Sequence, residues 1–293
     1  MMKFGRESKR TLSCIALTLL GLVLHTSPVA AATYTAIIVP GSIQTSANGI
    51  NNSNQVVGVY ELPDTSTEGF LLSNGTYTTV KFPGTMNNAA TGINDSGVMV
   101  GYYISNNIGH KDNGWIDQNG TFTPINYPLA TSTQPLGINN AGLVVGTYVD
   151  GRLVSHGFEY NSGIYKAINI SNAKDTLVAG INNLGDISGS YVDQSGHEHG
   201  FLLRSNGTLV TVSNPGGANA TVGGGLNDND QVVGYYTPTG ANFSRGYEWS
   251  SGKFANILYP LASSTFPSAI NNTQLVVGEW IGANGAEGFL ETP

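Results

Sequence analysis

The sequence predicts an all-β protein, a six-bladed β-propeller made of four-stranded antiparallel blades. Three observations support this prediction. A phrase of the type GINNxxxVVG occurs six times, at intervals of 43 to 45 residues. Each interval contains four strand-like runs separated by short turns of Asn, Asp, Gly and Ser. The last copy lacks its fourth run, and a matching run stands before the first copy.

The six copies are evenly spaced along the chain. They begin at Gly49, Gly92, Gly137, Gly180, Gly225 and Ala269. A fixed period in the forties is typical of repeat architectures in which each copy is one supersecondary unit. Two longer phrases, YPLATSTQPLGINNAGLVVG from Tyr127 and YPLASSTFPSAINNTQLVVG from Tyr259, are nearly identical and lie 132 positions apart. This distance equals three repeats, so we place these twin phrases on opposite sides of one ring, a pattern that favours a duplication of three blades.

The copy that starts at Gly92 shows the strand pattern within one repeat. The runs ATGIN, VMVGYYI, GWIDQ and TFTPINY are rich in β-branched and aromatic residues. The pair Asn119-Gly120 separates the third and fourth runs. Asn-Gly between two such runs is a strong hairpin signal, because both central residues of the turn need a positive φ. Each copy is therefore expected to be a meander of four antiparallel strands.

The two ends of the repeated region predict how the ring closes. The last copy, 269–293, contains only three runs, SAIN, LVVGEWI and EGFLET. The run TYTAIIVPG at 33–41 matches the fourth run of other copies, such as TYTTVKFPG at 76–84. We expect the N-terminal strand to complete the last blade, because a closed ring leaves no exposed strand edge. A parallel β-helix is the main alternative, but its coils are roughly half as long as this repeat.

Residues 1–32 have the layout of a secretory signal peptide. MMKFGRESKR carries four basic residues and one acid, TLSCIALTLLGLVL is apolar, and HTSPVAAA ends in small residues. We expect cleavage after Ala31 or Ala32 and a single domain over 33–293. The apolar run is shorter than the roughly 20 residues of a membrane span, and Cys14 is not preceded by a lipobox. The expected product is secreted, extracellular or periplasmic, with no membrane anchor.

The acidic composition argues against a nucleic acid or an anionic membrane as the partner. The chain has 12 Lys and Arg against 19 Asp and Glu, a net charge of −7, and four of the bases lie in its first ten residues. Binding to nucleic acid or to an anionic membrane needs clustered Lys and Arg. The only cysteine is Cys14, so disulfides cannot hold 33–293 together, and a chain of this length does not need them. We expect a monomer without a cofactor.

The copies resemble the HAF family of bacterial extracellular repeats, which is named after a His-Ala-Phe tripeptide near the third strand. The matching residues are His156-Gly157-Phe158 and His199-Gly200-Phe201, which follow the GINN phrase. The other four copies depart from the family at the first position, where they have Glu68, Asn113, Arg245 and Glu287. The resemblance covers the whole of 33–293. It implies export and a repeat architecture, and it implies no established chemistry.

The two faces of the predicted ring differ. The connections between second and third strands, and between one copy and the next, share one face, called here the loop face. They are longer and more variable than the tight Asn, Asp and Gly turns of the opposite face, called the turn face. Variable loops on a rigid frame are where binding residues concentrate. The candidate ligand-binding residues on the loop face are Tyr102, Asp112, Asp150, Arg152, Glu198, Tyr235 and Arg245.

Aromatic residues divide into two groups. Those that recur once per copy are expected to form the core between blades, and they are Tyr60, Tyr103, Tyr148, Tyr191, Tyr236 and Trp280 in the second strands and Phe70, Trp115, Phe158, Phe201, Tyr247 and Phe289 in the third strands. Tyr102, Tyr235, Phe243 and Phe266 escape this pattern. These four are the better candidates for contact with a ligand.

Four histidines fall between second and third strands, and they are His110, His156, His197 and His199. With the nearby acids Asp112, Asp150, Asp193 and Glu198 they could form a transition-metal site, since imidazole with carboxylate suits zinc. Packing is the preferred interpretation, because strand residues two apart share a face, so His156 and His199 point the same way as the core residues Phe158 and Phe201. The fragment NDND at 227–230 lacks the further ligands of a calcium loop. We expect no metal.

The sequence contains no Gly-rich phosphate loop, no Ser-His-Asp elbow and no nucleophilic Cys after residue 32. The favoured function is therefore a secreted, non-catalytic binding or interaction protein, whose ligand is a glycan or another extracellular protein. The alternative is a hydrolase or lyase acting on a polysaccharide, with Asp, Glu and His from several blades converging at the channel mouth. A third possibility is a surface or matrix component without a small ligand.

Overall fold

Strand follows strand through all of the chain that the computed structural model describes, which is residues 32–105, 111–213, 218–283 and 285–293. None of these residues is helical, and hence no described helix could cross a membrane. The strands are β1 (Thr33–Ile37), β2 (Gln44–Ile50), β3 (Val56–Glu61), β4 (Thr67–Ser73), β5 (Thr76–Val80), β6 (Asn87–Ile93), β7 (Met99–Ile104), β8 (Asp112–Gln118), β9 (Thr121–Ile125), β10 (Ser132–Ile138), β11 (Val144–Val149), β12 (Ser155–Asn161), β13 (Ile164–Ile168), β14 (Asp175–Ile181), β15 (Ile187–Val192), β16 (Glu198–Leu203), β17 (Leu209–Val212), β18 (Ala218–Leu226), β19 (Gln231–Pro238), β20 (Arg245–Ser250), β21 (Lys253–Ile257), β22 (Ser264–Ile270), β23 (Val276–Gly282) and β24 (Gly285–Thr292).

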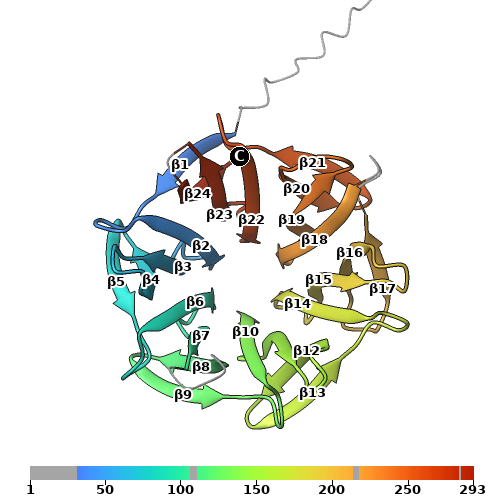
Figure 1. Ribbon diagram of the computed structural model, residues 1–293, viewed down its shortest axis with the longest axis horizontal. Helices are drawn as coiled ribbons and strands as arrows, with labels where there is room; N and C mark the ends of the chain where they lie inside the picture. The colour runs from blue at the N-terminus through green and yellow to red at the C-terminus, as the bar shows by residue number, and fades with distance from the viewer. Residues whose placement is uncertain (1–31, 106–110, 214–217, 284) are drawn as a thin grey trace, which may run out of the picture. The chain divides into compact units, whose positions relative to one another are not determined.

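The strands form a β-propeller of four-stranded sheets, as the sequence predicts. Four sheets have four strands each, in the orders β2-β3-β4-β5, β6-β7-β8-β9, β10-β11-β12-β13 and β1-β24-β23-β22. The remaining strands, β14 to β21, form one hydrogen-bonded sheet of eight, because β16 and β18 share a single parallel pair, Glu198 with Ala220. Figure 1 shows the sheets standing around a centre that is lined by β2, β6, β10, β14, β18 and β22.

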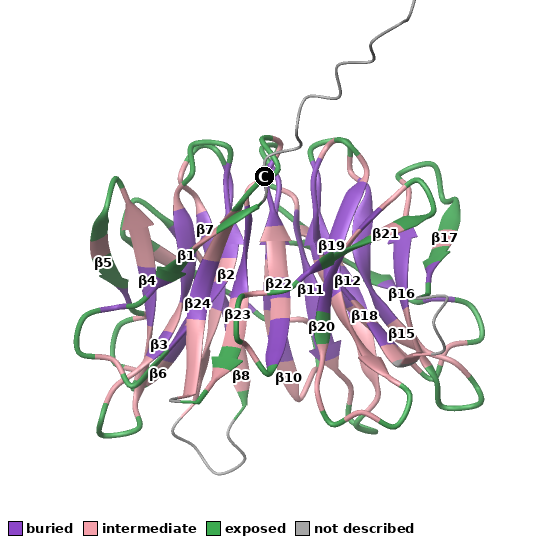
Figure 2. Cartoon of the chain, turned by 90° about the horizontal axis from the view of Figure 1, so that it is seen from above, coloured by how far each residue is buried: buried purple, intermediate pink, exposed green. Residues whose placement is uncertain are grey.

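The core lies between neighbouring sheets, where the aromatic residues of the third strands are fully buried. Phe70, Trp115, Phe158, Phe201, Tyr247 and Phe289 are each 0% exposed, which confirms their prediction as core. The glycine of the VVG phrase, or its equivalent, makes room for the ring in five copies, at Gly58, Gly101, Gly189, Gly234 and Gly278. A Cβ on Gly101 would lie only 2.3 Å from Cζ2 of Trp115. Figure 2 shows buried segments in the middle of the sheets and exposed ones at the turns and along outer strands such as β5 and β17.

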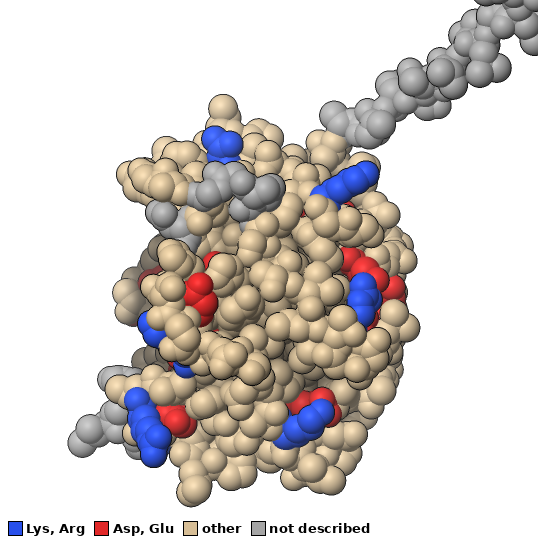
Figure 3. All heavy atoms as spheres, turned by 90° about the vertical axis from the view of Figure 1, so that its right-hand side faces the viewer, with Lys and Arg blue, Asp and Glu red and all other residues tan. Residues whose placement is uncertain are grey.

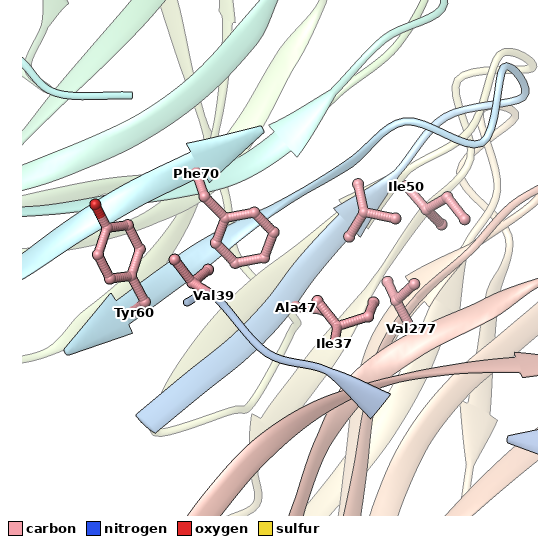
Figure 4. Close-up of a cluster of buried hydrophobic side chains, with 8 residues drawn as sticks. Ile37, Val39, Ala47, Ile50, Tyr60, Phe70 and Val277 are labelled. Carbon is pink, nitrogen blue, oxygen red and sulfur yellow. The ribbon is translucent and has the colours of Figure 1, made fainter. Parts of the chain in front are cut away.

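The N-terminal strand β1 completes the sheet of the last copy. It pairs antiparallel with β24, from Thr33 with Thr292 to Ile37 with Gly288. Ile37 is 3% exposed and belongs to a buried cluster that includes Ala47 and Val277 (Figure 4). The first and last parts of the described chain are therefore joined by both hydrogen bonds and apolar contact.

A closed circuit of hydrogen bonds runs around the turn face. One buried asparagine follows each innermost strand, and the six are Asn51, Asn94, Asn139, Asn182, Asn227 and Asn271. Asn139 shows the pattern. Its Oδ1 accepts the backbone N–H groups of Ala141 and Leu143, and its Nδ2 donates to the carbonyl of Asn182 at 3.2 Å. The other five asparagines make the same three bonds, and Asn271 donates to the carbonyl of Asn51 at 3.1 Å.

A second circuit lies beside the first one. The residue after each of the buried asparagines offers its backbone N–H to the side-chain oxygen of the equivalent residue in the next copy. Asn52 donates to Asp95 at 2.8 Å, Asp95 donates to Asn140 at 2.9 Å, and Asn272 returns to Asn52 at 2.9 Å. Asn140, Asn183 and Asp228 supply the links between. These two circuits give a physical reason for the repeated phrase INN or IND.

Substitution of a circuit asparagine should destabilise the protein. Asn139→Ala leaves the backbone N–H groups of Ala141 and Leu143 without their partner and removes one of the two hydrogen bonds that the Asn182 carbonyl accepts, at about 1–3 kcal/mol for each buried group left unpaired. We expect a loss of about 2–4 kcal/mol in the free energy of unfolding, measured by urea denaturation. Asn206→Ala is the control and should cost far less, because its Oδ1 also accepts a backbone N–H, that of Thr208, but in an exposed turn. Equal losses for the two variants would contradict this role of the circuit.

Deletion of residues 33–41 should expose the free edge of β24 and the apolar cluster around Ala47. We expect the truncated protein to aggregate or to unfold at a much lower temperature than the intact chain, as measured by differential scanning calorimetry. The apolar face of AIIV is lost together with the strand pairing. An unchanged melting temperature would show that β1 does not hold the ring closed.

Candidate functional site

The channel between the innermost strands is narrow except at the loop face. Its middle, lined by the glycines and isoleucines of the repeated phrase, encloses about 70 Å³, and so does the mouth at the turn face. At the loop face a cavity of about 270 Å³ opens, called here the loop-face mouth. Since a ligand needs a concave surface with a few placed polar groups, the loop-face mouth is the candidate site.

The copies differ from one another in the residues that line this mouth. The residue before the first position of each GINN phrase lines the mouth and differs in every copy, and these residues are Asn48, Thr91, Leu136, Ala179, Gly224 and Ser268. Three residues earlier the chain has Thr in five copies and Asn in one. Thr133, for example, accepts the backbone N–H of Tyr127 at 3.0 Å. The sequence is thus uniform where a side chain holds the fold and varied where it faces the mouth.

Two of the predicted site residues, Tyr102 on β7 and Tyr235 on β19, line the loop-face mouth together with Gln134. Both follow the glycine of the VVG phrase, a place where the other copies have Val59, Thr147, Ser190 and Glu279. Burial raises the pKa of both hydroxyls, and a nearby carboxylate adds to this effect: Asp112 for Tyr102 and Glu198 for Tyr235. The Phe266 ring meets Tyr235 edge-on at 4.9 Å.

Asp112 and Glu198 lie behind the side chains of the mouth. Oδ2 of Asp112 accepts hydrogen bonds from Nε2 of Gln134 at 2.7 Å and from the Ser132 hydroxyl at 2.8 Å. Oε1 of Glu198 accepts one from the Ser190 hydroxyl at 2.8 Å. Asp112 therefore holds Gln134 of the channel wall in place, and both acids bring negative charge close to the tyrosines of the mouth.

Glu279 on β23 was missed by the sequence analysis. It occupies the same place in its copy as Tyr102 and Tyr235 do in theirs, and its Oε2 accepts a hydrogen bond from the Ser46 hydroxyl of β2. The sequence signal was the same as for the two tyrosines. Each of these residues follows the glycine of the VVG phrase, a position where the copies differ from one another.

The other predicted site residues lie elsewhere on the loop face. Asp150 caps its own loop, since its Oδ1 accepts the backbone N–H groups of Val154 at 3.0 Å and Arg152 at 2.8 Å. These two hydrogen bonds lower the pKa of the Asp150 carboxyl. The side chain of Arg152 is exposed. Arg245 stands over the Phe243 ring at 5.4 Å and lines a separate groove of about 290 Å³. None of these three residues lines the loop-face mouth.

His156 and His199 are held by neighbours within their own sheets. Nδ1 of His156 lies 2.7 Å from Oδ1 of Asn169, and its ring packs on Tyr148 at 5.0 Å. Nε2 of His199 lies 3.1 Å from Oδ2 of Asp193, and this hydrogen bond is the main reason why the pKa of the Asp193 carboxyl is lowered.

The remaining histidines do not extend this arrangement into a ligand cluster. His197 also approaches Asp193, at 3.6 Å. His110 lies outside the described residues. Within the described part of the chain, no three His, Cys, Asp or Glu side chains come together as metal ligands would.

The twin phrases carry two unusual leucines at the tips of loop-face connections. Leu129 and Leu261 both have φ of 64° and are 99% and 101% exposed. The same turn position holds Gly41, Gly84 and Asn172 in other copies. A left-handed backbone costs an ordinary residue about 1–2 kcal/mol, and an exposed leucine contributes no burial in return. The fold alone gives no reason for leucine at these two tips.

The histidines should not hold a metal in the folded protein. Protein purified without an affinity tag is expected to contain much less than one equivalent of zinc, copper, nickel or iron in elemental analysis, because the rings of His156 and His199 are already hydrogen-bonded and packed. A full equivalent that disappears in the double variant His197→Ala/His199→Ala would overturn this prediction.

Comparison with known proteins shows the fold alone. No family model matches the chain, and no curated protein matches it. Among solved structures, TolB from Acinetobacter baumannii is similar over 81% of this chain and 63% of its own, with a TM-score of 0.54 and 12% identity. The β-propeller domain of the trilobed protease from Pyrococcus furiosus is similar over 85% and 96%, with a TM-score of 0.53 and 11% identity. A point mutant of the Aleuria aurantia lectin in complex with α-methyl-L-fucoside is similar over 87% and 93%, with a TM-score of 0.53 and 9% identity. The chain thus shares the β-propeller architecture with proteins of different functions.

Proposed function

We propose that this chain is a secreted, non-catalytic binding protein that takes a glycan at the loop-face mouth. The observation that carries the proposal is the place where the repeat breaks. The six mouth-lining residues that directly precede the GINN phrases are all different, while the Thr or Asn three residues earlier is nearly uniform. Selection for the fold alone gives no reason for six different residues at one equivalent position of the channel wall.

We infer that the ring has six blades and that the sheet of eight strands, β14 to β21, is two of them. Between its two halves, β14–β17 and β18–β21, strand pairing is limited to one residue pair, Glu198 with Ala220. Each half also contributes its own asparagine, Asn182 and Asn227, to the circuit of six. This count agrees with the six copies in the sequence.

The chemistry of the mouth suits a sugar. Tyr102 and Tyr235 offer aromatic faces and hydroxyls from different sheets, and the amides of Asn48 and Gln134 with the hydroxyl of Ser268 lie between them. Flat aromatic surface combined with neutral polar groups matches the apolar face and the hydroxyl groups of a pyranose ring. The fold that this chain shares with a fucoside-bound lectin is consistent with such a role, as an analogy of architecture.

A second candidate, docking of another extracellular protein on the loop face, is favoured by Leu129 and Leu261. Both are strained and exposed, and they stand three repeats apart on the same face. A partner that buries them would give a reason for leucine where glycine or asparagine would fit the backbone better.

Export is part of the proposal and rests on the layout of residues 1–32. It can be checked by cell fractionation and by N-terminal sequencing of the released protein. A new N-terminus at Ala32 or Thr33 is expected. Full-length protein retained inside the cell would contradict export.

Binding should depend on the mouth and not on the turn face. A glycan array and a polysaccharide pull-down, with reducing-sugar release measured alongside, would identify the ligand and reveal any hydrolysis. Tyr102→Ala and Tyr235→Ala should each weaken binding by about 1 kcal/mol or more, as measured by isothermal titration calorimetry.

Arg152→Ala and Arg245→Ala test the loop face outside the mouth, and Asn206→Ala tests the turn face. Asn206→Ala should change stability only. The site is misplaced if Asn206→Ala abolishes binding in folded protein while Tyr102→Ala has no effect.

A further inference from the structure

Three carboxylates lie near the loop-face mouth without lining it. Asp112 on β8, Glu198 on β16 and Glu279 on β23 are each about two repeats from the next, so they are spread around the ring instead of gathering at one point. Asp112 accepts a hydrogen bond from Gln134, which lines the cavity, and Glu279 accepts one from Ser46, the residue in the same place on β2. Glu198 accepts one from the buried Ser190 of β15. These contacts place negative charge behind the wall on three sides of the cavity.

The charge of these carboxylates is not neutralised by basic side chains. Their hydrogen-bond partners are hydroxyls and an amide, and within the described part of the chain every ion pair involves other acids, such as Glu68 with Lys81 or Asp230 with Arg204. The residues that line the cavity include no Lys or Arg. On the flank of the ring, unlike at the mouth, basic and acidic side chains lie close together (Figure 3).

The field of these acids reaches the aromatic groups of the mouth. After burial, the charge of Asp112 is the next cause of the raised pKa of Tyr102, and Glu198 acts in the same way on Tyr235. A concave site with charge of one sign concentrates ligands of the opposite sign. Tyrosine faces also attract cations, by about 0.5–1 kcal/mol at exposed sites and by more when the cation loses its water. The mouth therefore favours a positively charged group.

The neutral side chains of the mouth indicate which kind of ligand carries the positively charged group. Asn48, Gln134 and Ser268 offer amide and hydroxyl groups from three innermost strands. The amide nitrogens of Asn48 and Gln134 already donate to the Ala90 carbonyl and to Asp112. A lysine side chain has only methylene groups below its ammonium and would offer no hydrogen bond to the two amide oxygens or to the Ser268 hydroxyl when it displaces water from them, at a cost for each. A sugar ring bears hydroxyls on several sides and can meet them. A cavity of about 270 Å³ lies just below the usual range for small-ligand sites and suits one ring better than a chain.

We propose that the loop-face mouth binds a glycan through an amino sugar whose amine is free and protonated, as in oligomers of glucosamine. This inference rests on the proposed function, because it uses the same site. The ammonium is held by the field of Asp112, Glu198 and Glu279, and the ring lies against Tyr102 or Tyr235. A glycan with acidic sugars is repelled from the mouth by the same charges.

The test compares two trisaccharides that differ only at nitrogen. The β-1,4-linked trimer of glucosamine and its fully N-acetylated form are titrated into the folded protein by isothermal titration calorimetry, at low and at high salt. The free amine form should bind at least about tenfold more tightly at low salt, and added salt should reduce this advantage. Asp112→Asn and Glu198→Gln should each reduce the preference severalfold. Glu159→Gln, which removes an acid paired with Lys166 elsewhere on the ring, should leave it unchanged.

The outcomes separate this inference from the function on which it rests. Equal binding of both trimers, weakened by Tyr102→Ala, would overturn the preference for an amine and would leave a glycan-binding mouth in place. Binding of neither trimer, or tighter binding of a trilysine peptide than of the glucosamine trimer, would also overturn it. Failure of the proposed function is a different result: no glycan of any charge binds in the screen.

Discussion

The circuit of asparagines on the turn face is the constraint on which the ring depends, because it joins every copy to the next one by a buried hydrogen bond. Each asparagine satisfies two backbone N–H groups in its own turn and one carbonyl in the next copy, so a single side chain both closes a turn and joins two neighbours. The last one, Asn271, reaches the carbonyl of Asn51. Because no member of the circuit is terminal, the bond that closes the ring is of the same kind as all the others. Together with the pairing of β1 and β24, it compensates for the absence of disulfides after residue 32.

A rigid turn face leaves the opposite face free to vary. Glycines such as Gly101 permit close packing of the aromatic core, and threonines such as Thr133 tie each loop-face connection to the strand that follows. Residues between these fixed points line the mouth, and two of them, Asn48 and Thr91, also donate a side-chain hydrogen bond to a carbonyl of the next sheet. This division explains how one chain keeps six nearly equal copies and still presents a mouth in which almost every side chain is different.

The candidate site was predicted in part, for physical reasons that differ from residue to residue. Tyr102 and Tyr235 stood out because they interrupt the pattern of the second strand, and the structure brings both to one cavity. Asp150 interrupts no such pattern, and its carboxylate is used by the backbone of its own loop. Glu279 breaks the pattern of the second strand at the same position as the two tyrosines, but the break was used as a sign of ligand contact for aromatic residues only.

Patterns along the chain were enough to predict the architecture: the all-β class, the four-strand repeat, the role of the N-terminal strand in completing the last sheet and the aromatic core. These properties depend on local turn chemistry and on alternation along a strand, which repeat with every copy and are visible in one dimension. Which residues from distant copies meet could be learned only from the folded ring, since that depends on the direction of each strand and on the width of the channel. The fold brings Asp112 to Gln134 and Glu279 to Ser46, although these partners belong to different sheets and share no pattern along the chain.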